Sequence, residues 1–185
     1  ATRAFVAVQL DDAGRACLAE AAERLRLLAP GVAWVARDNL HLTLKFLGNV
    51  ETSRLAEVER ALATAAAARP SYELDVRGLG AFPTRTRARV LWAGVGAGAA
   101  ETAALAASVD DALAALGFAR EGHAFAAHIT LGRVREPRAN PRLAEALDGG
   151  AAFGRQRVRR IALMRSELSP RGARYTELAS LPLGP

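Results

Sequence analysis

One tetrapeptide pattern occurs twice in this chain of 185 residues, and it constrains the fold more than any other feature. Residues 41–44 read His-Leu-Thr-Leu and residues 128–131 read His-Ile-Thr-Leu. Because side chains alternate between the two faces of a strand, the histidine and the threonine of each copy share one face and the apolar pair lies on the other. Packing explains the apolar pair, but it does not explain why the polar pair is repeated. The pattern therefore predicts two equivalent strands that each present a histidine and a threonine.

The segments around the two copies repeat one order of elements. In the first half, periodicity predicts strands and helices in the order strand 3–9, helix 11–29, strand 34–47, helix 54–68 and strand 72–79. In the second half the order is strand 89–95, helix 99–116, strand 125–131, helix 140–147, strand 158–168 and a short strand 175–178. Repeated supersecondary units often pack about a pseudo-two-fold axis. We therefore expect the two histidines to face each other across a central cleft.

These patterns predict an α+β protein of two similar lobes with helices outside. At this length one compact unit is the ordinary case, so we expect a single bilobal domain over residues 1–185. The internal repeat would comprise residues 1–80 and 87–178, approximately. Gly80, Pro83 and the arginine-containing run 85–89 mark the expected boundary between the lobes.

The charge of the chain indicates the kind of partner it binds, and its cysteine content indicates its cellular compartment. The net charge of +6 favours a polyanionic partner, and of the 25 basic residues only Lys45 is a lysine. Arginine binds phosphate in a bidentate manner, although an Arg-rich and Ala-rich chain also results from genome composition. Cys17 is the only cysteine and lies in a helical pattern, which predicts a buried, inert thiol and a cytoplasmic protein. No apolar stretch approaches the ~20 residues needed to span a bilayer, so we expect no membrane association.

The paired side chains indicate a particular chemistry. Imidazole has an unperturbed pKa close to neutral, so two histidines in one cleft can supply a general base and a general acid together. Threonine hydroxyls can donate hydrogen bonds to phosphate oxygens as charge develops on them. This combination suits in-line displacement at phosphorus without a metal ion or a cofactor.

Several rival sites are disfavoured by the sequence. Residues 94–99 (Gly-Val-Gly-Ala-Gly-Ala) fit the Ala-ending form of the dinucleotide fingerprint. The fingerprint also needs an acidic residue at the end of the next strand, whereas Asp110 and Asp111 lie within the predicted helix. The chain has no P-loop and no Gly-x-Ser-x-Gly motif. His123 is the only other histidine, and the three are not spaced as zinc ligands.

The motifs together resemble the RNA 2′,3′-cyclic phosphodiesterase family, also called 2′-5′ RNA ligase or LigT-like proteins, of the two-histidine phosphoesterase superfamily. Residues 34–35 and 39–48 are similar to its first signature, 90–95 to its mid-chain strand, and 166–168, 172 and 175–176 to its C-terminal pattern. The resemblance implies antiparallel sheets around a groove and hydrolysis of a terminal 2′,3′-cyclic phosphate to a 2′-phosphate. It also implies reversible, ATP-independent 2′-5′ ligation. RNA ends, such as those of tRNA fragments, would be the substrates of a monomeric enzyme.

The same resemblance suggests roles for individual residues. It makes His41 the proton donor and His128 the proton acceptor, and it places Arg133 on the scissile phosphate, with Thr43 and Thr130 as further phosphate ligands. Strand parity puts Arg133 on the opposite face from His128 unless the strand ends or bulges at the intervening glycine.

Three further residues near the motifs have expected positions. Lys45 shares parity with His41 and could line the groove, but a lysine at a strand end is expected to face solvent. Phe46 resembles a position that stacks on the terminal base in the family, but its parity with Leu44 predicts a place in the core. His123 is expected on a surface turn.

Two alternatives to RNA hydrolysis stay open. A two-histidine phosphoesterase with the same motifs can act on a small cyclic nucleotide or on ADP-ribose cyclic phosphate. A non-catalytic RNA-binding module would use the same arginine-rich groove, but it would have no reason to keep both His-Thr pairs.

Overall fold

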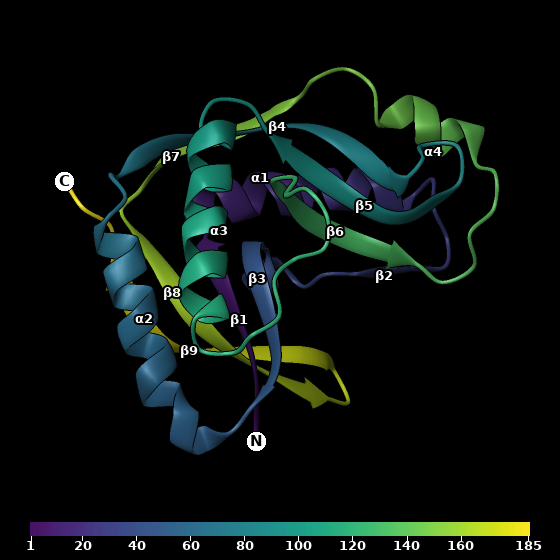
Figure 1. Ribbon diagram of the computed structural model, residues 1–185. Helices are drawn as coiled ribbons and strands as arrows, with labels where there is room; N and C mark the ends of the chain where they lie inside the picture. Colours follow the sequence, from purple (N-terminus) through teal and green to yellow (C-terminus); the bar gives the residue numbers. More distant parts are fainter.

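The computed structural model describes all residues 1–185 and contains nine strands and four α-helices (Figure 1). The strands are β1 (Thr2–Gln9), β2 (Val32–Trp34), β3 (His41–Val50), β4 (Tyr72–Pro83), β5 (Ala88–Val95), β6 (His128–Val134), β7 (Ala152–Val158), β8 (Arg160–Ser169) and β9 (Gly172–Pro182). The helices are α1 (Asp12–Arg26), α2 (Leu55–Ala67), α3 (Ala99–Ala114) and α4 (Pro141–Ala146), with short 3-10 turns at Arg37–Asn39 and Thr52–Arg54.

All strands belong to one curled antiparallel sheet, which confirms the predicted α+β class. Its order is β7-β4-β5-β6-β3-β1-β8-β9, and β2 pairs with β6 off this path. One half of the sheet comprises β3, β1, β8 and β9, and the other comprises β6, β5, β4 and β7. The halves meet where β3 pairs with β6 at Leu42 and Ile129, the second residues of the two tetrapeptides. The repeated motifs therefore lie side by side at the centre of the sheet.

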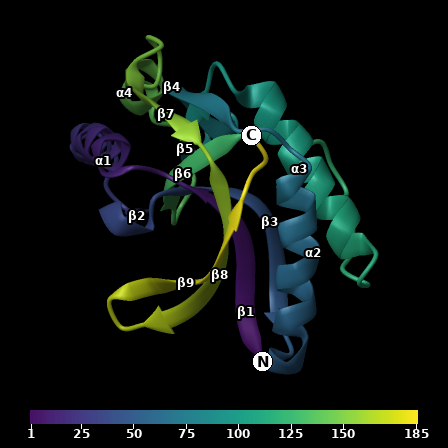
Figure 2. The ribbon, with the colours of Figure 1, turned by 90° about the vertical axis from the view of Figure 1, so that its left-hand side faces the viewer.

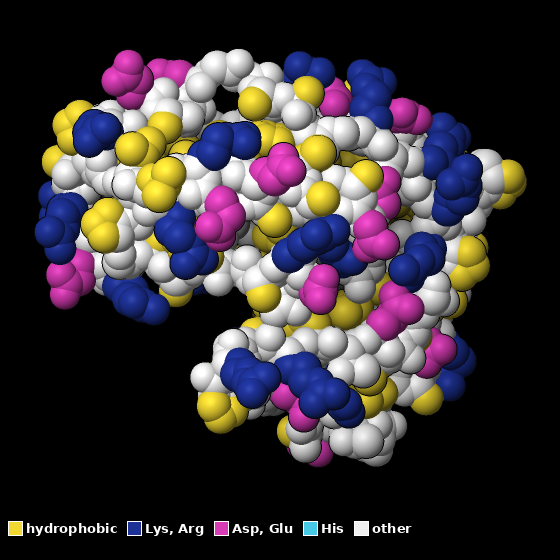
Figure 3. Space-filling view, turned by 180° about the vertical axis from the view of Figure 1, so that it is seen from behind, with side chains coloured by type: hydrophobic (Ala, Val, Ile, Leu, Met, Phe, Trp, Pro, Cys, Tyr) yellow, Lys and Arg dark blue, Asp and Glu magenta, His cyan; other side chains and the backbone are white.

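The helices cover the outside of these two lobes. Helices α2 and α3 pack on each other, α3 also contacts β3 and α2 contacts β9, while α1 packs against β7 (Figure 2). Figure 3 shows from behind that the molecule is hollowed between its larger part and its smaller part. None of the helices has the length and apolar character needed to cross a membrane.

The pairing of β4 and β8 could not be read from the repeat. β4, the last strand of the first unit, pairs with β5 and β7, and β8 from the second unit pairs with β1. Residues 84–87 connect β4 to β5 within one antiparallel hairpin. The division of the sequence into repeats near 1–80 and 87–178 stays a prediction.

Most predicted elements occur, with shifted ends. The helix predicted over 11–29 ends at Arg26, and the strand predicted to begin near 125 begins at His128. Strand β7 was not predicted because only Phe153 and Val158 of its residues are buried, and it forms one edge of the sheet. Such a polar edge strand lacks the apolar alternation on which prediction depends.

The apolar residues of both tetrapeptides are core residues, as predicted. Leu42, Leu44, Ile129 and Leu131 are no more than 3% exposed. Burial of one such side chain contributes about 1.5–3 kcal/mol, so these four fix the two central strands in the sheet.

The prediction for Cys17 was wrong, because this residue is exposed. The buried face of α1 is formed by Leu18, Ala21 and Leu25. Cys17 stands beside that face on the helix surface, and an Ala-rich helix gives a weak signal of which residues face the core.

Candidate active site

Both histidines lie in one cleft of about 580 Å³ at the junction of the two lobes. Because β3 and β6 are antiparallel, the two tetrapeptides run past each other about the Leu42–Ile129 pair. Their polar side chains all line the cleft, and the same cleft contains Arg133. The structure thus brings together the five predicted site residues, which are His41, Thr43, His128, Thr130 and Arg133.

Each imidazole is oriented by a backbone carbonyl two residues earlier in the chain. Nδ1 of His41 is 2.7 Å from the carbonyl oxygen of Asn39, and Nδ1 of His128 is 2.7 Å from that of Ala126. A carbonyl oxygen only accepts hydrogen bonds, so Nδ1 carries the proton in both rings. In the neutral form Nε2 is then the basic nitrogen, and it is this atom that can exchange a proton with a substrate.

The surroundings of His41 are apolar and aromatic. Its ring centroid is 4.8 Å from that of Phe5 and 5.3 Å from that of Tyr175, which meets it edge-on. Burial lowers the pKa of His41 below its ordinary value of 6.5, the Asn39 carbonyl opposes this shift, and the positive charge of Arg15 adds to it. The hydroxyl of Thr43 donates to Nε2 at 2.8 Å. Burial and the hydrogen bond from Thr43 thus both favour the neutral form of the His41 imidazole in the free protein.

His128 is half-buried and has fewer neighbours. Its ring meets Phe82 edge-on at 5.1 Å between centroids, and Phe82 in turn packs on Trp92. The hydroxyl of Thr130 makes no hydrogen bond to its Nε2, in contrast to the pair formed by His41 and Thr43. Nε2 of His128 is thus available to a ligand in the cleft without the loss of an internal bond.

A bulge in β6 explains how Arg133 reaches the cleft, although strict alternation would place it on the opposite face of the strand from His128. Thr130 pairs with Trp92, but Gly132 pairs with Leu91, so Leu131 has no partner of its own in β5. The extra residue inverts the alternation beyond it and turns Arg133 toward the face of His128. Gly132 permits this path, because a Cβ there would lie 2.7 Å from Cγ1 of Val32.

The same irregularity occurs in β3, and it makes the prediction for Phe46 wrong. Thr43 pairs with Ala7 and Lys45 with Val6, so Leu44 is the unpaired residue. Phe46 then shares the face of His41 and Thr43, is 64% exposed and lines the cleft. Alternation alone had placed it in the core with Leu44.

Lys45 differs from expectation, whereas His123 lies on the surface between two elements as predicted. The bulge turns Lys45 inward, so it is 3% exposed rather than facing solvent as predicted. His123 is exposed in the connection between α3 and β6, and it contributes to the lining of the cleft.

Sequence reasoning missed the aromatic residues that pack on the two histidines. Phe5, Phe82 and Tyr175 come from β1, β4 and β9, far from either tetrapeptide in sequence. The only available signal was the similarity of residues 175–176 to the family's C-terminal pattern. Burial raises the pKa of the Tyr175 hydroxyl, and the positive charge of Arg133 partly opposes this shift.

The glycine-rich segment before α3 serves packing. A Cβ on Gly98 would lie 2.4 Å from the carbonyl oxygen of Glu73, and one on Gly96 would lie 3.0 Å from the carboxylate of Asp75. Asp75 is itself 4% exposed and paired with Arg77 at 3.0 Å. A buried carboxylate beside this loop repels the phosphates that a dinucleotide-binding loop must attract. Elsewhere in the chain, no group of three or more His, Cys, Asp or Glu side chains is arranged to hold a metal ion.

Comparison with known proteins identifies the family. The model of the LigT-like phosphoesterases matches residues 8–92 and 95–175, which is most of the chain. The chain belongs to the LigT-like phosphoesterase family. As a member of this family, it has the predicted bilobal, antiparallel architecture.

Curated relatives and solved structures agree with that assignment. An RNA 2′,3′-cyclic phosphodiesterase of Archaeoglobus fulgidus is 38% identical over 95% of this chain and 97% of that protein, and one of Methanothermobacter thermautotrophicus is 34% identical over 95% and 96%. A crystal structure from Thermus thermophilus superposes with a TM-score of 0.80 at 30% identity, covering 98% of this chain and 97% of that one. Escherichia coli LigT complexed with 3′-AMP superposes with a TM-score of 0.75 at 26% identity, covering 98% of each chain.

Proposed function

We propose that this LigT-like phosphoesterase is an RNA 2′,3′-cyclic phosphodiesterase that hydrolyses a terminal 2′,3′-cyclic phosphate to a 2′-phosphate. The observation that carries the proposal is the pair of imidazoles in one cleft, each with Nδ1 on a backbone carbonyl and Nε2 as its basic nitrogen. The names of the relatives at 34–38% identity support the same reaction.

The reaction requires two proton transfers, and each is assigned to one histidine. Nε2 of His128 takes a proton from water as the water oxygen bonds to phosphorus, and Nε2 of His41 gives a proton to the 3′ oxygen as its bond to phosphorus breaks. His41 must be protonated for this step, and the anionic phosphate favours its protonated form in the complex. An imidazolium whose pKa is lowered by burial gives up its proton readily, which supports the role of donor for His41.

The phosphate oxygens need donors as charge builds on them. Arg133 offers a planar guanidinium that can bind two oxygens together, and the hydroxyls of Thr43 and Thr130 offer one hydrogen bond each. Binding of a phosphate oxygen by Thr43 would release Nε2 of His41 from its present hydrogen bond, so the two events are coupled.

The substrate's nucleoside would lie beside the exposed ring of Phe46. Base stacking on such an aromatic residue contributes about 1–3 kcal/mol and tolerates any base. On the face shown in Figure 3, basic side chains are interspersed with Asp and Glu. We place recognition of the terminal nucleotide in the cleft, with RNA ends as substrates.

The same geometry accommodates ligation. If a 5′-hydroxyl takes the place of water, breakage of the same bond to the 3′ oxygen leaves a 2′-5′ linkage, and no nucleotide triphosphate enters the balance. We include this reversible reaction in the proposal, together with independence from metal ions.

The test is incubation of the protein with oligoribonucleotides ending in 2′,3′-cyclic phosphate, in EDTA and without ATP. Mononucleoside 2′,3′-cyclic phosphates and ADP-ribose cyclic phosphate serve as parallel substrates. We expect 2′-phosphate ends, with a higher kcat/KM for the oligonucleotide than for either small substrate. Preference for a small cyclic phosphate, or activity that EDTA abolishes and a divalent ion restores, would overturn the corresponding part of the proposal.

A further inference from the structure

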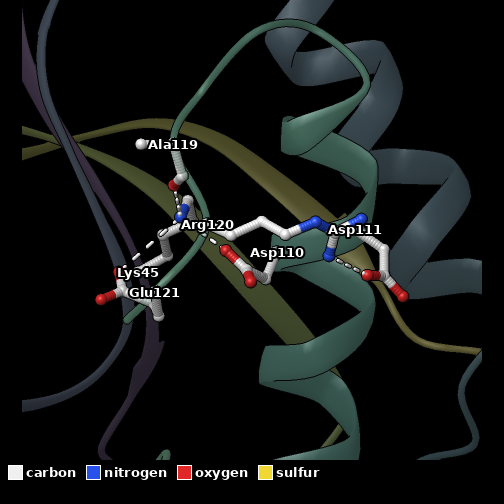
Figure 4. Close-up of polar contacts among 6 residues, drawn as sticks. All are labelled: Lys45, Asp110, Asp111, Ala119, Arg120 and Glu121. Carbon is white, nitrogen blue, oxygen red and sulfur yellow. Dashed lines mark hydrogen bonds and ion pairs between the residues drawn. The ribbon is translucent and has the colours of Figure 1, made fainter. Parts of the chain in front are cut away.

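The only lysine of the chain is a buried residue of the cleft lining, and its ammonium group is bound to α3 and to the loop that follows it. Nζ of Lys45 lies 2.6 Å from Oδ1 of Asp110 in α3, 2.8 Å from the carbonyl oxygen of Ala119 and 3.6 Å from Oε1 of Glu121 (Figure 4). Of the three N–H donors of the ammonium group, one donates to Asp110 and one to Ala119, while Glu121 lies at ion-pair distance. These three partners account for the position of the ammonium group without a phosphate.

Two of the three acceptors belong to the α3–β6 loop, residues 115–127. None of the backbone–backbone hydrogen bonds outside helices and strands involves residues 119–127. The start of the loop is held by Arg54, which donates to the carbonyl of Leu116 at 2.6 Å and lies over the ring of Phe118. Beyond that point, Lys45 supplies the buried anchor.

This loop forms one wall of the cleft. Its residues that line the cleft are Glu121, His123, Ala124, Phe125 and Ala126. The wall and Phe46 line the same cleft, and the bulge in β3 that turns Phe46 toward the cleft turns Lys45 toward Asp110 of α3. The position of this wall thus depends on contacts made by the residue adjacent to Phe46.

The ion pair of Lys45 and Asp110 is largely shielded from solvent. The lysine side chain is 2% exposed and that of Asp110 is 18% exposed, so solvent screens the pair weakly. The hydrogen bond from Lys45 is the main cause of the lowered pKa of Asp110. Removal of one member would leave the other charged and partly buried, which is more costly than loss of an exposed pair.

We propose that Lys45 is a positioning residue that holds the α3–β6 loop as the wall of the nucleoside subsite. This inference rests on the proposed function, because it assigns the wall to the nucleoside part of the cyclic phosphate substrate. Lys45 acts through Asp110, Ala119 and Glu121 and makes no contact with the phosphate.

The test compares three variants in the full-length protein. Lys45→Met removes the charge and keeps an unbranched side chain, and Asp110→Asn keeps the lysine and weakens its anchor. Asp111→Asn is the matched control, because the pair of Asp111 with Arg120 joins the same helix to the same loop but is exposed (Figure 4). Three quantities are measured: amide hydrogen exchange of residues 119–127, KM and kcat for a dinucleotide ending in 2′,3′-cyclic phosphate, and the inhibition constant of inorganic phosphate.

We expect Lys45→Met and Asp110→Asn to speed loop exchange and to raise KM, each on the order of tenfold, as for the loss of a coupled contact. The value of kcat should change less than about threefold, and the inhibition constant of inorganic phosphate should stay unchanged, because the phosphate ligands are untouched. Asp111→Asn should leave all of these quantities at their original values.

Several outcomes would overturn the proposal. Unchanged exchange in both anchor variants would show that the loop does not depend on Lys45, and a rise in the phosphate inhibition constant equal to the rise in KM would place Lys45 on the phosphate. If Lys45→Met lowers the thermal unfolding temperature too far for assay, Asp110→Asn decides the outcome. If the unmodified protein does not hydrolyse the dinucleotide, the proposed function fails, whereas the exchange measurement still tests the anchor.

Discussion

The two histidine half-sites have the same local sequence and different surroundings. In both, a strand starts at the histidine, and the carbonyl oxygen two residues earlier accepts a hydrogen bond from Nδ1. A bulge follows the threonine in each strand. His41 is enclosed by Phe5 and Tyr175 and bonded to Thr43, whereas His128 meets only Phe82 and keeps Nε2 free of internal bonds. The duplicated motif therefore supplies two equal groups, and distant residues make them unequal.

The residues beyond the two bulges extend this difference. Phe46 and Arg133 stand at corresponding positions after the two tetrapeptides, and both line the cleft. Phe46 is aromatic and can stack on a nucleobase, whereas Arg133 is a cation and can bind a phosphate. The half-sites thus share a backbone path and differ in the part of a nucleotide that each can bind.

Loss of either histidine should have the largest effect. His41→Ala and His128→Ala should each lower kcat on the cyclic-phosphate oligonucleotide by about 10²–10⁴-fold, because each removes one proton transfer. Steady-state kinetics with circular dichroism as a check of folding measures this. Full activity in either variant would contradict the two-histidine mechanism. His123→Ala is the control, since His123 lines the cleft but has no assigned proton, and its kcat should stay within about threefold of the original.

Loss of Arg133 should have the next largest effect. Arg133→Met should lower kcat/KM on the order of 10²-fold by removing a charged donor to the phosphate, and Arg133→Lys should restore only part of it, because lysine lacks the planar fork. Arg135→Met is the matched control, since Arg135 lies just beyond the end of the same strand but does not line this cleft. Equal losses at both positions would indicate that general positive charge, rather than Arg133, binds the substrate.

The two threonines should have smaller and unequal effects. The phosphate is anionic, and a hydrogen bond to a charged group contributes about 1.5 kcal/mol or more, so Thr130→Val should lower kcat/KM on the order of tenfold. Thr43→Val should also remove the internal bond to His41, so its effect should include a change in the pH profile that Thr130→Val does not show. Identical profiles for the two variants would contradict the asymmetry of the half-sites.

The pH dependence tests the enclosure of His41. Because burial lowers its pKa, its protonated form is lost as pH rises through a value below 6.5, so the alkaline limb of kcat/KM should begin below that pH. The two limbs of the pH profile belong to the coupled pair of histidines, so the informative quantity is the shift of a limb between variants. Tyr175→Ala should hydrate His41, raise its pKa and move the alkaline limb to higher pH. NMR titration of the His41 ring provides a direct check, and an unmoved resonance would contradict this cause.

The core of the site could be predicted from sequence because it repeats. Strand parity placed His41 with Thr43 and His128 with Thr130, and it placed the four apolar residues of the tetrapeptides in the core. It failed at Phe46 and Lys45, because a bulge inverts alternation and leaves no mark in one sequence. At Arg133 the preceding residue, Gly132, indicated that a bulge was possible in β6 as well.

The aromatic residues around the two histidines and the placement of β4 and β8 in the sheet could not be predicted, for a different reason. Phe5, Phe82 and Tyr175 reach the histidines through pairings between strands far apart in sequence, and single-sequence periodicity contains no information on such pairings. The placement of β4 and β8 in opposite halves of the sheet depends on the same long-range register. The two His-Thr pairs could thus be predicted from the sequence, whereas the difference between the surroundings of the two histidines could not.

The most direct test of the division of roles uses a substrate in which sulfur replaces the bridging 3′ oxygen. A thiol has a pKa near ~8.5, so this leaving group needs little protonation and no longer depends on a general acid. The measurement is kcat for His41→Ala and His128→Ala on the sulfur substrate and on the natural one. The account predicts that His41→Ala recovers most of its lost activity with sulfur while His128→Ala stays impaired. Equal impairment of both variants, or recovery of His128→Ala alone, would contradict it.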